Sequence, residues 1–471
     1  MLKELIKTAL VVAVFFVGAP IMGALLKNRR GWQRAAFALM CFMTINGLMA
    51  EGNWGKTLMS IEWYRGHTKG FHFYFNEALA IALIVARGLE QPKALLRIPA
   101  GLPIYLMYCF LSSVSLFTAP EPLFVVMAAH KMLFVLVIFL ATYHFIRSPD
   151  DIAFFLKTMA ATLCWEAFVV LKMKYLDGIY QVRGTFEHQN PLSMYAIMIG
   201  MVFLASALAT RNPSARWCAA AFMACGIIVQ SALSRAGLVI FAGGVVGIVG
   251  LSLLERITAR RAGFVAMMAL VGSLGLALTL DTIVARFGDR GNAASSELRD
   301  VLNEASRRMA QDRFFGVGWN NYGLAINHPY PYAEVVYAWL EDRNMPVDYD
   351  SPNALVESHY YLLLAENGYL GYGSYILLIV SFLWRNLRAA IAFGPGLIRW
   401  VSLGIAAGCT LNYTQSLLER VLTQPRNLML WMILLGLTSR IEACRTDRRK
   451  PFREERLPTV NSPLNQKPDK P

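Results

Sequence analysis

The sequence predicts an all-α, polytopic integral membrane protein with about 12–13 transmembrane helices and one long external loop. Of its 471 residues, 56% are hydrophobic and only 16% are charged, far less charge than a soluble protein of this length carries. The hydrophobic residues gather in runs, many of them near the ~20 residues that a helix needs to cross the hydrocarbon core of a bilayer. These runs lie near 8–26, 35–50, 71–86, 98–119, 122–146, 152–175, 191–210, 217–233, 236–254, 262–280, 359–384, 397–418 and 427–441.

The net charge of +14 is explained by membrane topology rather than by nucleic-acid binding. Lysine and arginine concentrate in short connections that are separated by even numbers of predicted spans, so these connections share one face of the membrane. An excess of Lys and Arg in short loops marks the cytoplasmic face. We therefore expect a lipid bilayer around the protein and no nucleic-acid partner. The basic connections lie at 27–34, 87–97, 211–216, 256–261 and 385–388.

The pattern divides the chain into N-terminal transmembrane helices (1–280), a loop (281–358), C-terminal transmembrane helices (359–444) and a tail (445–471) that is expected to be disordered and cytoplasmic. The loop then faces the opposite side, which in a bacterial inner membrane is the periplasm. An amphipathic helix is predicted in the loop from Glu297, with Ser296 as its N-cap. The path of residues 1–50 stays open, because Gly18 and Pro20 would permit a hairpin.

Neither a metal nor another cofactor is expected. The seven cysteines include no CxxC pair, and the external segments hold no cluster of histidine and carboxylate residues with metal-ligand spacing. Gly316 and Gly318 predict a tight backbone turn rather than a phosphate-binding loop, because no strand precedes them.

Three basic or imidazole groups stand at the external boundary of the membrane. Arg183 precedes one span, Arg235 lies between two spans with almost no loop, and His359 begins the span that follows the long loop. A charge near the apolar boundary is costly, so an arginine such as Arg235 is retained where it faces a cavity or binds an anion with both arms of its guanidinium. An interfacial arginine that reaches to water is the plainer alternative for either position.

Four stretches carry a resemblance to a known family: RGTFEHQN at 183–190, SALSRAG at 231–237, DRFFGVGWNNYG at 312–323 and SHYYLLLAENGYLGYG at 358–373. In this order, the chain resembles the O-antigen ligase and polymerase superfamily of bacterial envelope glycosyltransferases, and is similar to the O-glycosylation ligases associated with exosortase systems. The resemblance implies metal-independent transfer of a glycan from undecaprenyl diphosphate to an acceptor hydroxyl at the periplasmic face. It assigns donor binding to Arg183 and Arg235 and catalysis to His359.

The chemistry of these residues agrees with that assignment. Guanidinium groups in a poorly solvated site can hold the negative charge that develops on a leaving diphosphate. Histidine, with an unperturbed pKa near 6.5, is suited to remove the proton of an acceptor hydroxyl, and neighbouring arginines disfavour its charged form.

Three further residues are weaker candidates for substrate binding. Lys131, next to His130, lies about ten residues into a span and could reach a phosphate, with a buried structural pair as the equal alternative. Glu366 shares a helical face with His359 and could orient His359 or Arg235, although a pairing with a buried base is favoured. Arg299 could contact the diphosphate or the acceptor, but a solvated helix face is the simpler reading.

Two alternative functions remain open from the sequence. A glycan polymerase would use nearly the same site with a growing glycan as acceptor, so the acceptor can be a lipid, a protein or a glycan. A polysaccharide or lipid transporter is less favoured, because the sequence shows no convincing internal repeat and its polar groups gather at one face.

Overall fold

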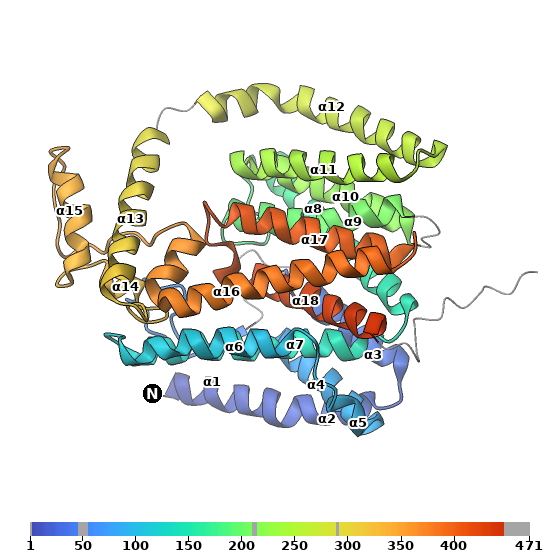
Figure 1. The fold of residues 1–471 in the computed structure, drawn as a ribbon, viewed down its shortest axis with the longest axis horizontal. Helices are drawn as coiled ribbons and strands as arrows, with labels where there is room; N and C mark the ends of the chain where they lie inside the picture. Colours follow the sequence, from blue (N-terminus) through green and yellow to red (C-terminus); the bar gives the residue numbers. More distant parts are fainter. Residues whose placement is uncertain (1, 46–54, 210–213, 289–291, 447–471) are drawn as a thin grey trace, which may run out of the picture.

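The computed structural model describes residues 2–45, 55–209, 214–288 and 292–446, which form a bundle of roughly aligned helices (Figure 1). The first half comprises α1 (Leu2–Val12), a π-helical stretch (Ala13–Gly18), α2 (Ala19–Leu26), α3 (Arg30–Phe42), β1 (Gly55–Leu58), β2 (Phe71–Tyr74), α4 (Phe75–Glu90), α5 (Pro92–Leu95), α6 (Leu102–Ser113) with a 3₁₀ turn (Val114–Phe117), α7 (Pro122–Phe145), α8 (Pro149–Tyr175), α9 (Gln189–Leu208) and α10 (Ala215–Ala232). The second half comprises α11 (Arg235–Glu255), α12 (Ala259–Gly288), α13 (Asn292–Asp312), α14 (Tyr322–Ala325), a 3₁₀ turn (Pro331–Ala333), α15 (Glu334–Glu341), α16 (His359–Ala392), α17 (Leu397–Gln415), a 3₁₀ turn (Val421–Thr423) and α18 (Pro425–Thr446).

The predicted fold class is confirmed. Eight helices in the described part of the chain are long and apolar enough to cross a membrane: the continuous α1–α2 helix, α7, α8, α9, α10, α11, α16 and α18. The other predicted runs also fall on helices, namely α3, α4, α6, α12 and α17. The end of the 35–50 run and the tail from 447 lie outside the described residues.

Successive helices alternate in direction, so the connections divide between the two ends of the bundle (Figure 1). One end carries α13, α14, α15 and the N-terminus, and we call it the loop end. The opposite end carries the connections at 256–258 and 393–396, next to the basic residues at 256–261 and 385–388 that the sequence assigns to the cytoplasm. Helix α9, which is buried from Pro191 to its end, packs at the centre against α10 and α17.

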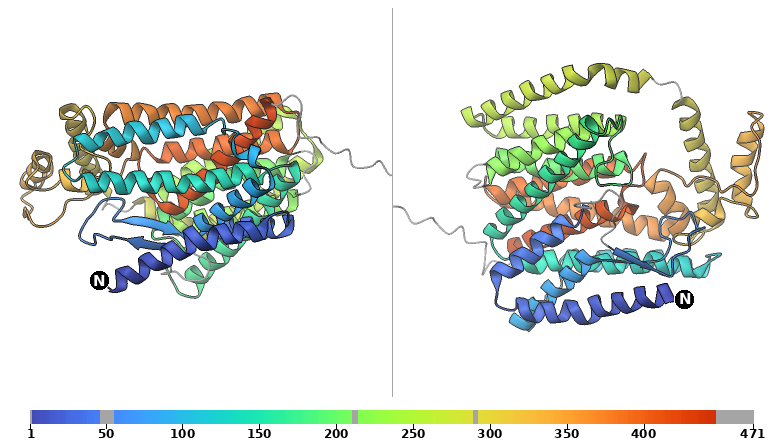
Figure 2. Two further views of the ribbon diagram at one scale, coloured as in Figure 1. Left: turned by 90° about the horizontal axis from the view of Figure 1, so that it is seen from below. Right: turned by 180° about the vertical axis from the view of Figure 1, so that it is seen from behind.

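Four details differ from the sequence-based expectations or complete them. The helix runs through Gly18 and Pro20 without forming a hairpin, and a π-helical stretch (Ala13–Gly18) directly precedes the turn that contains Pro20. Helix α12 continues to Gly288, so the long loop begins later than residue 281. Ser296 is not the N-cap of α13, which already begins at Asn292. Finally, an antiparallel β1–β2 hairpin precedes α4 and lies beside α1 and α7 (Figure 2), and its second strand takes up residues 71–74 of the run that was predicted as one span.

A kink in α16 joins this helix to the long loop. Gly368 has a φ of 62°, in the left-handed region that glycine adopts readily, and it interrupts the helical backbone there. The turn at 313–318 fills the break: Val317 N–H donates to the Ala365 carbonyl at 2.8 Å, and Tyr369 N–H donates to the Phe314 carbonyl at 3.0 Å. The tight turn predicted at Gly316 and Gly318 is confirmed, with φ values of 84° and 108°.

Substituting Gly368 with alanine should destabilise the protein strongly. A Cβ on Gly368 would lie 2.1 Å from the Phe314 carbonyl oxygen, and the left-handed backbone adds about 1–2 kcal/mol of strain on its own. Gly373 in the same helix is the matched control, because a Cβ there meets no atom within 4 Å. Thermal unfolding in detergent should show a clearly lower Tm for Gly368→Ala and little change for Gly373→Ala. Equal Tm values would contradict the close packing of the turn and the kink.

The topology can be tested by cysteine labelling. Asp348 in the long loop and Gly394 between α16 and α17 are both exposed and lie at opposite ends of the bundle. With the exposed Cys164 replaced by serine, an impermeant thiol reagent added to intact cells should label Asp348→Cys and not Gly394→Cys. The reverse pattern would place the loop end in the cytoplasm and overturn the positive-inside assignment.

Candidate functional site

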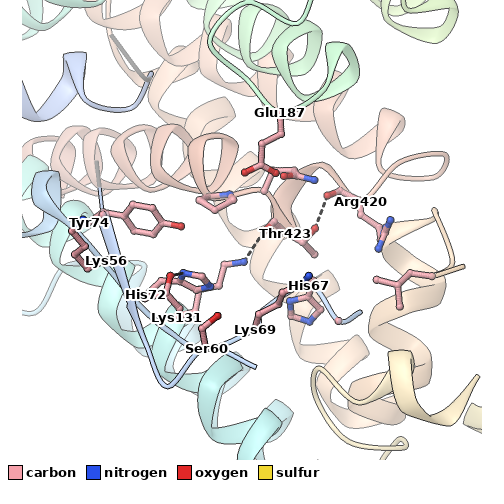
Figure 3. A pocket seen from close by; sticks show the side chains of 16 residues that line it. Lys56, Ser60, His67, Lys69, His72, Tyr74, Lys131, Glu187, Arg420 and Thr423 are labelled. Carbon is pink, nitrogen blue, oxygen red and sulfur yellow. Dashed lines mark hydrogen bonds between the residues drawn. The ribbon is translucent and has the colours of Figure 1, made fainter. Parts of the chain in front are cut away.

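A cavity of about 530 Å³ lies at the loop end, between the β1–β2 hairpin, α7 and the connection from α17 to α18 (Figure 3). We call it the main cavity. Its volume falls within the range of small-molecule and cofactor sites. The hairpin supplies residues from both strands and from the turn between them, whereas α7 supplies one long side chain. The polar side chains in its wall are those of Lys56, Thr57, Ser60, His67, Lys69, His72, Tyr74, Lys131, Glu187, Arg420, Thr423 and Gln424.

Four of these side chains are cations, and Glu187 is the one carboxylate among the lining residues. Lys131 extends from the apolar helix α7 and is only 7% exposed, and its Nζ donates to the Thr423 carbonyl at 2.7 Å. Arg420 has no carboxylate within 4.0 Å in the described part of the chain. The cavity is therefore positively charged and suited to an anion.

Burial modifies the titration of two lining residues outside the transmembrane helices. Desolvation, reinforced by the charges of Lys131 and His130, lowers the pKa of His72 to about 4, so this imidazole is neutral at physiological pH. Desolvation also lowers the pKa of Arg420, but a guanidinium stays protonated in proteins, so its charge is retained at the cavity.

A second, much smaller space of about 30 Å³ lies behind the main cavity, and we call it the inner cavity. It is enclosed by aromatic side chains, among them Trp319 and Tyr375, and has room for about one water molecule. His67, Lys131 and Thr423 line both cavities, whereas His359 lines only the inner one. The His359 side chain lies at the first residue of α16 and is 4% exposed.

A carboxylate holds His67 in place. Its Nε2 lies 3.1 Å from Glu366 Oε2, and the other carboxylate oxygen accepts the Tyr322 N–H at 3.2 Å. Glu366 is 1% exposed and is followed almost at once by the kink at Gly368. Glu366 therefore partners a buried base, as the sequence favoured, and that base is His67.

Four sequence-predicted residues do not line either cavity: Glu366, described above, and three arginines. Arg299 on α13 forms an ion pair with Glu357 in the partly exposed loop. Arg183 is exposed in the connection from α8 to α9, and Arg235 is the first residue of α11. The two arginines lie on neighbouring segments, because Val182 N–H donates to the carbonyl of Ser231 at the end of α10.

The Arg183 segment is anchored to the rim of the main cavity. Buried Glu166 of α8 accepts hydrogen bonds from the backbone N–H and the hydroxyl of Thr185, both at 2.8 Å. Arg426, which follows the cavity-lining Pro425, donates to the Thr185 carbonyl. Glu187, two residues further along, then reaches the cavity wall (Figure 3).

Several cavity residues were missed by sequence reasoning, although a signal for them existed. The parity that puts the 177–190 connection at the external face also puts the 51–70 and 419–426 connections there. Both segments are rich in basic and imidazole groups for their length. They supply Lys56, His67, Lys69 and Arg420 to the main cavity, and His72 follows on β2.

Among the residues that the structure describes, no three histidine, cysteine, aspartate or glutamate side chains are grouped so that they could hold a metal ion. A comparison of the chain with models of protein families and with curated proteins finds no match. Its function is therefore inferred from the chemistry of the two cavities: an anion site at the loop end, with the imidazoles of His67 and His72 in its wall and that of His359 behind it.

Proposed function

We propose that this protein is a bacterial inner-membrane glycosyltransferase that moves a glycan from undecaprenyl diphosphate to an acceptor hydroxyl at the periplasmic face. The observation that supports it is the cationic main cavity at the loop end, which combines Lys131 and Arg420 with imidazole groups. The order of motifs that resembles the O-antigen ligase superfamily points to the same chemistry.

The leaving group accounts for the cations. When the bond from the anomeric carbon to the phosphate oxygen breaks, negative charge develops on the diphosphate. Lys131, held in an apolar helix, and Arg420 can stabilise this charge in a poorly solvated cavity, where fixed charges act more strongly than in water. The exposed Lys56 and Lys69 add to the attraction for the anion.

The position of the cavity accounts for the two substrates. It lies at one end of the transmembrane helices, where a lipid-linked diphosphate at the membrane surface can meet a hydroxyl that arrives from the aqueous side (Figure 1). Leu355 of the long loop contributes to its wall, so the loop is placed to contact the acceptor. A ligase and a polymerase differ in this acceptor and share the donor chemistry.

Purified full-length protein in nanodiscs tests the proposal. The donor is undecaprenyl diphosphate that carries the labelled glycan of the host, and the acceptors are lipid A-core, a serine- and threonine-containing peptide and the free glycan. Transfer to one acceptor with release of undecaprenyl diphosphate is the expected result. Elongated lipid-linked glycan as the product would identify a polymerase, and no transfer to any acceptor would refute the proposal.

A further inference from the structure

We propose that His67, oriented by Glu366, is the base that removes the proton from the acceptor hydroxyl. This inference rests on the proposed glycosyl transfer and assigns one step of it to a residue that the motif resemblance does not include. His67 lies in the turn of the β1–β2 hairpin, 299 positions away from Glu366 in the chain.

The hydrogen bond to Glu366 determines which nitrogen of His67 can act. A carboxylate only accepts hydrogen bonds, so the proton of the neutral imidazole lies on Nε2, 3.1 Å from Glu366 Oε2. The lone pair is then on Nδ1, which is buried and has no hydrogen-bond partner among the described residues. A carboxylate that fixes the tautomer of an imidazole and stabilises its protonated form is the arrangement that general bases use in hydrolases.

Access separates His67 from His359. The main cavity, at about 530 Å³, can admit part of a sugar or a side chain with its hydroxyl, and His67 lines it. His359 lines only the inner cavity of about 30 Å³, which has room for about one water molecule, and within the described segments no carboxylate hydrogen-bonds to its ring. An acceptor hydroxyl in the main cavity can therefore reach His67 but not His359.

The cations needed for the leaving group stand beside the same imidazole. Lys131 lines both cavities together with His67, and Arg420 lines the main cavity. Figure 3 shows His67 between the Lys131 side chain and Arg420 in the wall of the main cavity. A donor diphosphate bound by these cations brings its anomeric carbon into the space that His67 faces.

The step conserves atoms and charge. The acceptor oxygen forms a bond to the anomeric carbon while its proton passes to Nδ1 of His67. The bond between the anomeric carbon and the phosphate oxygen breaks, and its electron pair leaves with undecaprenyl diphosphate. Glu366 balances the positive charge on the protonated imidazole, which later returns its proton to solvent.

Two substitutions test the assignment by different routes. His67→Ala removes the base, and transfer should fall by about 10²–10⁴-fold. Glu366→Gln should lower transfer to a similar degree, because it changes which nitrogen of His67 carries the proton. Because Tyr322 N–H needs an acceptor, the amide oxygen will take that side and its NH₂ will face His67 Nε2. The imidazole proton then moves to Nδ1, and the lone pair that would take the acceptor's proton is lost.

Imidazole in the buffer separates a chemical role from a structural one. The space vacated in His67→Ala borders the main cavity, so added imidazole should restore part of the transfer by this variant. It should not restore Glu366→Gln, in which the His67 ring still fills the site. His328→Ala, which removes an exposed imidazole of the long loop, is the control and should keep wild-type activity.

Binding of glycan-free undecaprenyl diphosphate completes the test, and its affinity should be unchanged in His67→Ala. Wild-type transfer by His67→Ala, or a loss that imidazole does not restore, would overturn the inference and leave the proposed function intact. Loss of transfer in His359→Ala with full activity in His67→Ala would assign the base to His359. Absence of transfer by the wild-type protein would refute the proposed function and this inference together.

Discussion

Replacing Lys131 with methionine is expected to lower transfer by about 10²–10³-fold, the loss typical when one preorganised group that stabilises transition-state charge is removed. Methionine keeps the length of the side chain and its fit in α7 but removes the charge. The ammonium of Lys131 lies in the wall that the two cavities share, next to the Thr423 carbonyl. Both the affinity for the donor diphosphate and the rate of the chemical step should therefore fall.

The measurements are the Kd of glycan-free undecaprenyl diphosphate and kcat/KM for transfer. Lys157→Met, on an exposed position of α8, is the control and should leave both unchanged. Arg420→Met should resemble Lys131→Met. Unaltered diphosphate affinity in both cavity variants would show that the anion binds elsewhere on the loop end.

Arg183→Lys and Arg235→Lys should each lower kcat/KM by about tenfold to a hundredfold while expression and topology persist. Lysine keeps the charge but loses the planar fork that binds two oxygens of a diphosphate, and a hydrogen bond to a charged group contributes about 1.5–3 kcal/mol. The backbone bond between Val182 and Ser231 places the two arginine segments side by side at the loop end.

The same transfer assay measures this effect, with Arg216→Lys near the opposite end of the bundle as the control. Wild-type turnover in both variants would remove the two arginines from the donor site. Because neither arginine lines the main cavity, such a result would leave Lys131 and Arg420 as the groups that hold the diphosphate.

The transmembrane helices were predictable because they follow a local rule. An apolar run of sufficient length forms a helix in a membrane, where backbone groups must be paired internally. The hairpin was not predictable, because Gly55–Leu58 is only four residues long and Phe71–Tyr74 stands at the start of the apolar run 71–86, which was assigned to a helix as a whole. The kink at Gly368 follows from a contact with Gly316, and no spacing rule links these two positions.

The candidate site was predictable only in part. Lys131 was identified because a lysine inside an apolar run is conspicuous, and Glu366 for the same reason. His67 and Arg420 lie in polar connections, where charged and imidazole side chains are common and do not by themselves indicate a site. Their nearness to Lys131 and Glu366 arises from the packing of the hairpin and of the 416–424 segment, which the sequence does not encode as a local pattern.

The turn that fills the α16 kink ties Glu366 to the long loop at two points. Its carbonyl accepts the Gly318 N–H at 3.1 Å and its side chain accepts the Tyr322 N–H, so the long loop holds this residue at both its backbone and its carboxylate. Any substrate that displaces residues 316–322 must also displace the carboxylate and, with it, the imidazole that the carboxylate orients. Binding at the long loop is thereby coupled to the orientation of the His67 ring in the wall of the main cavity.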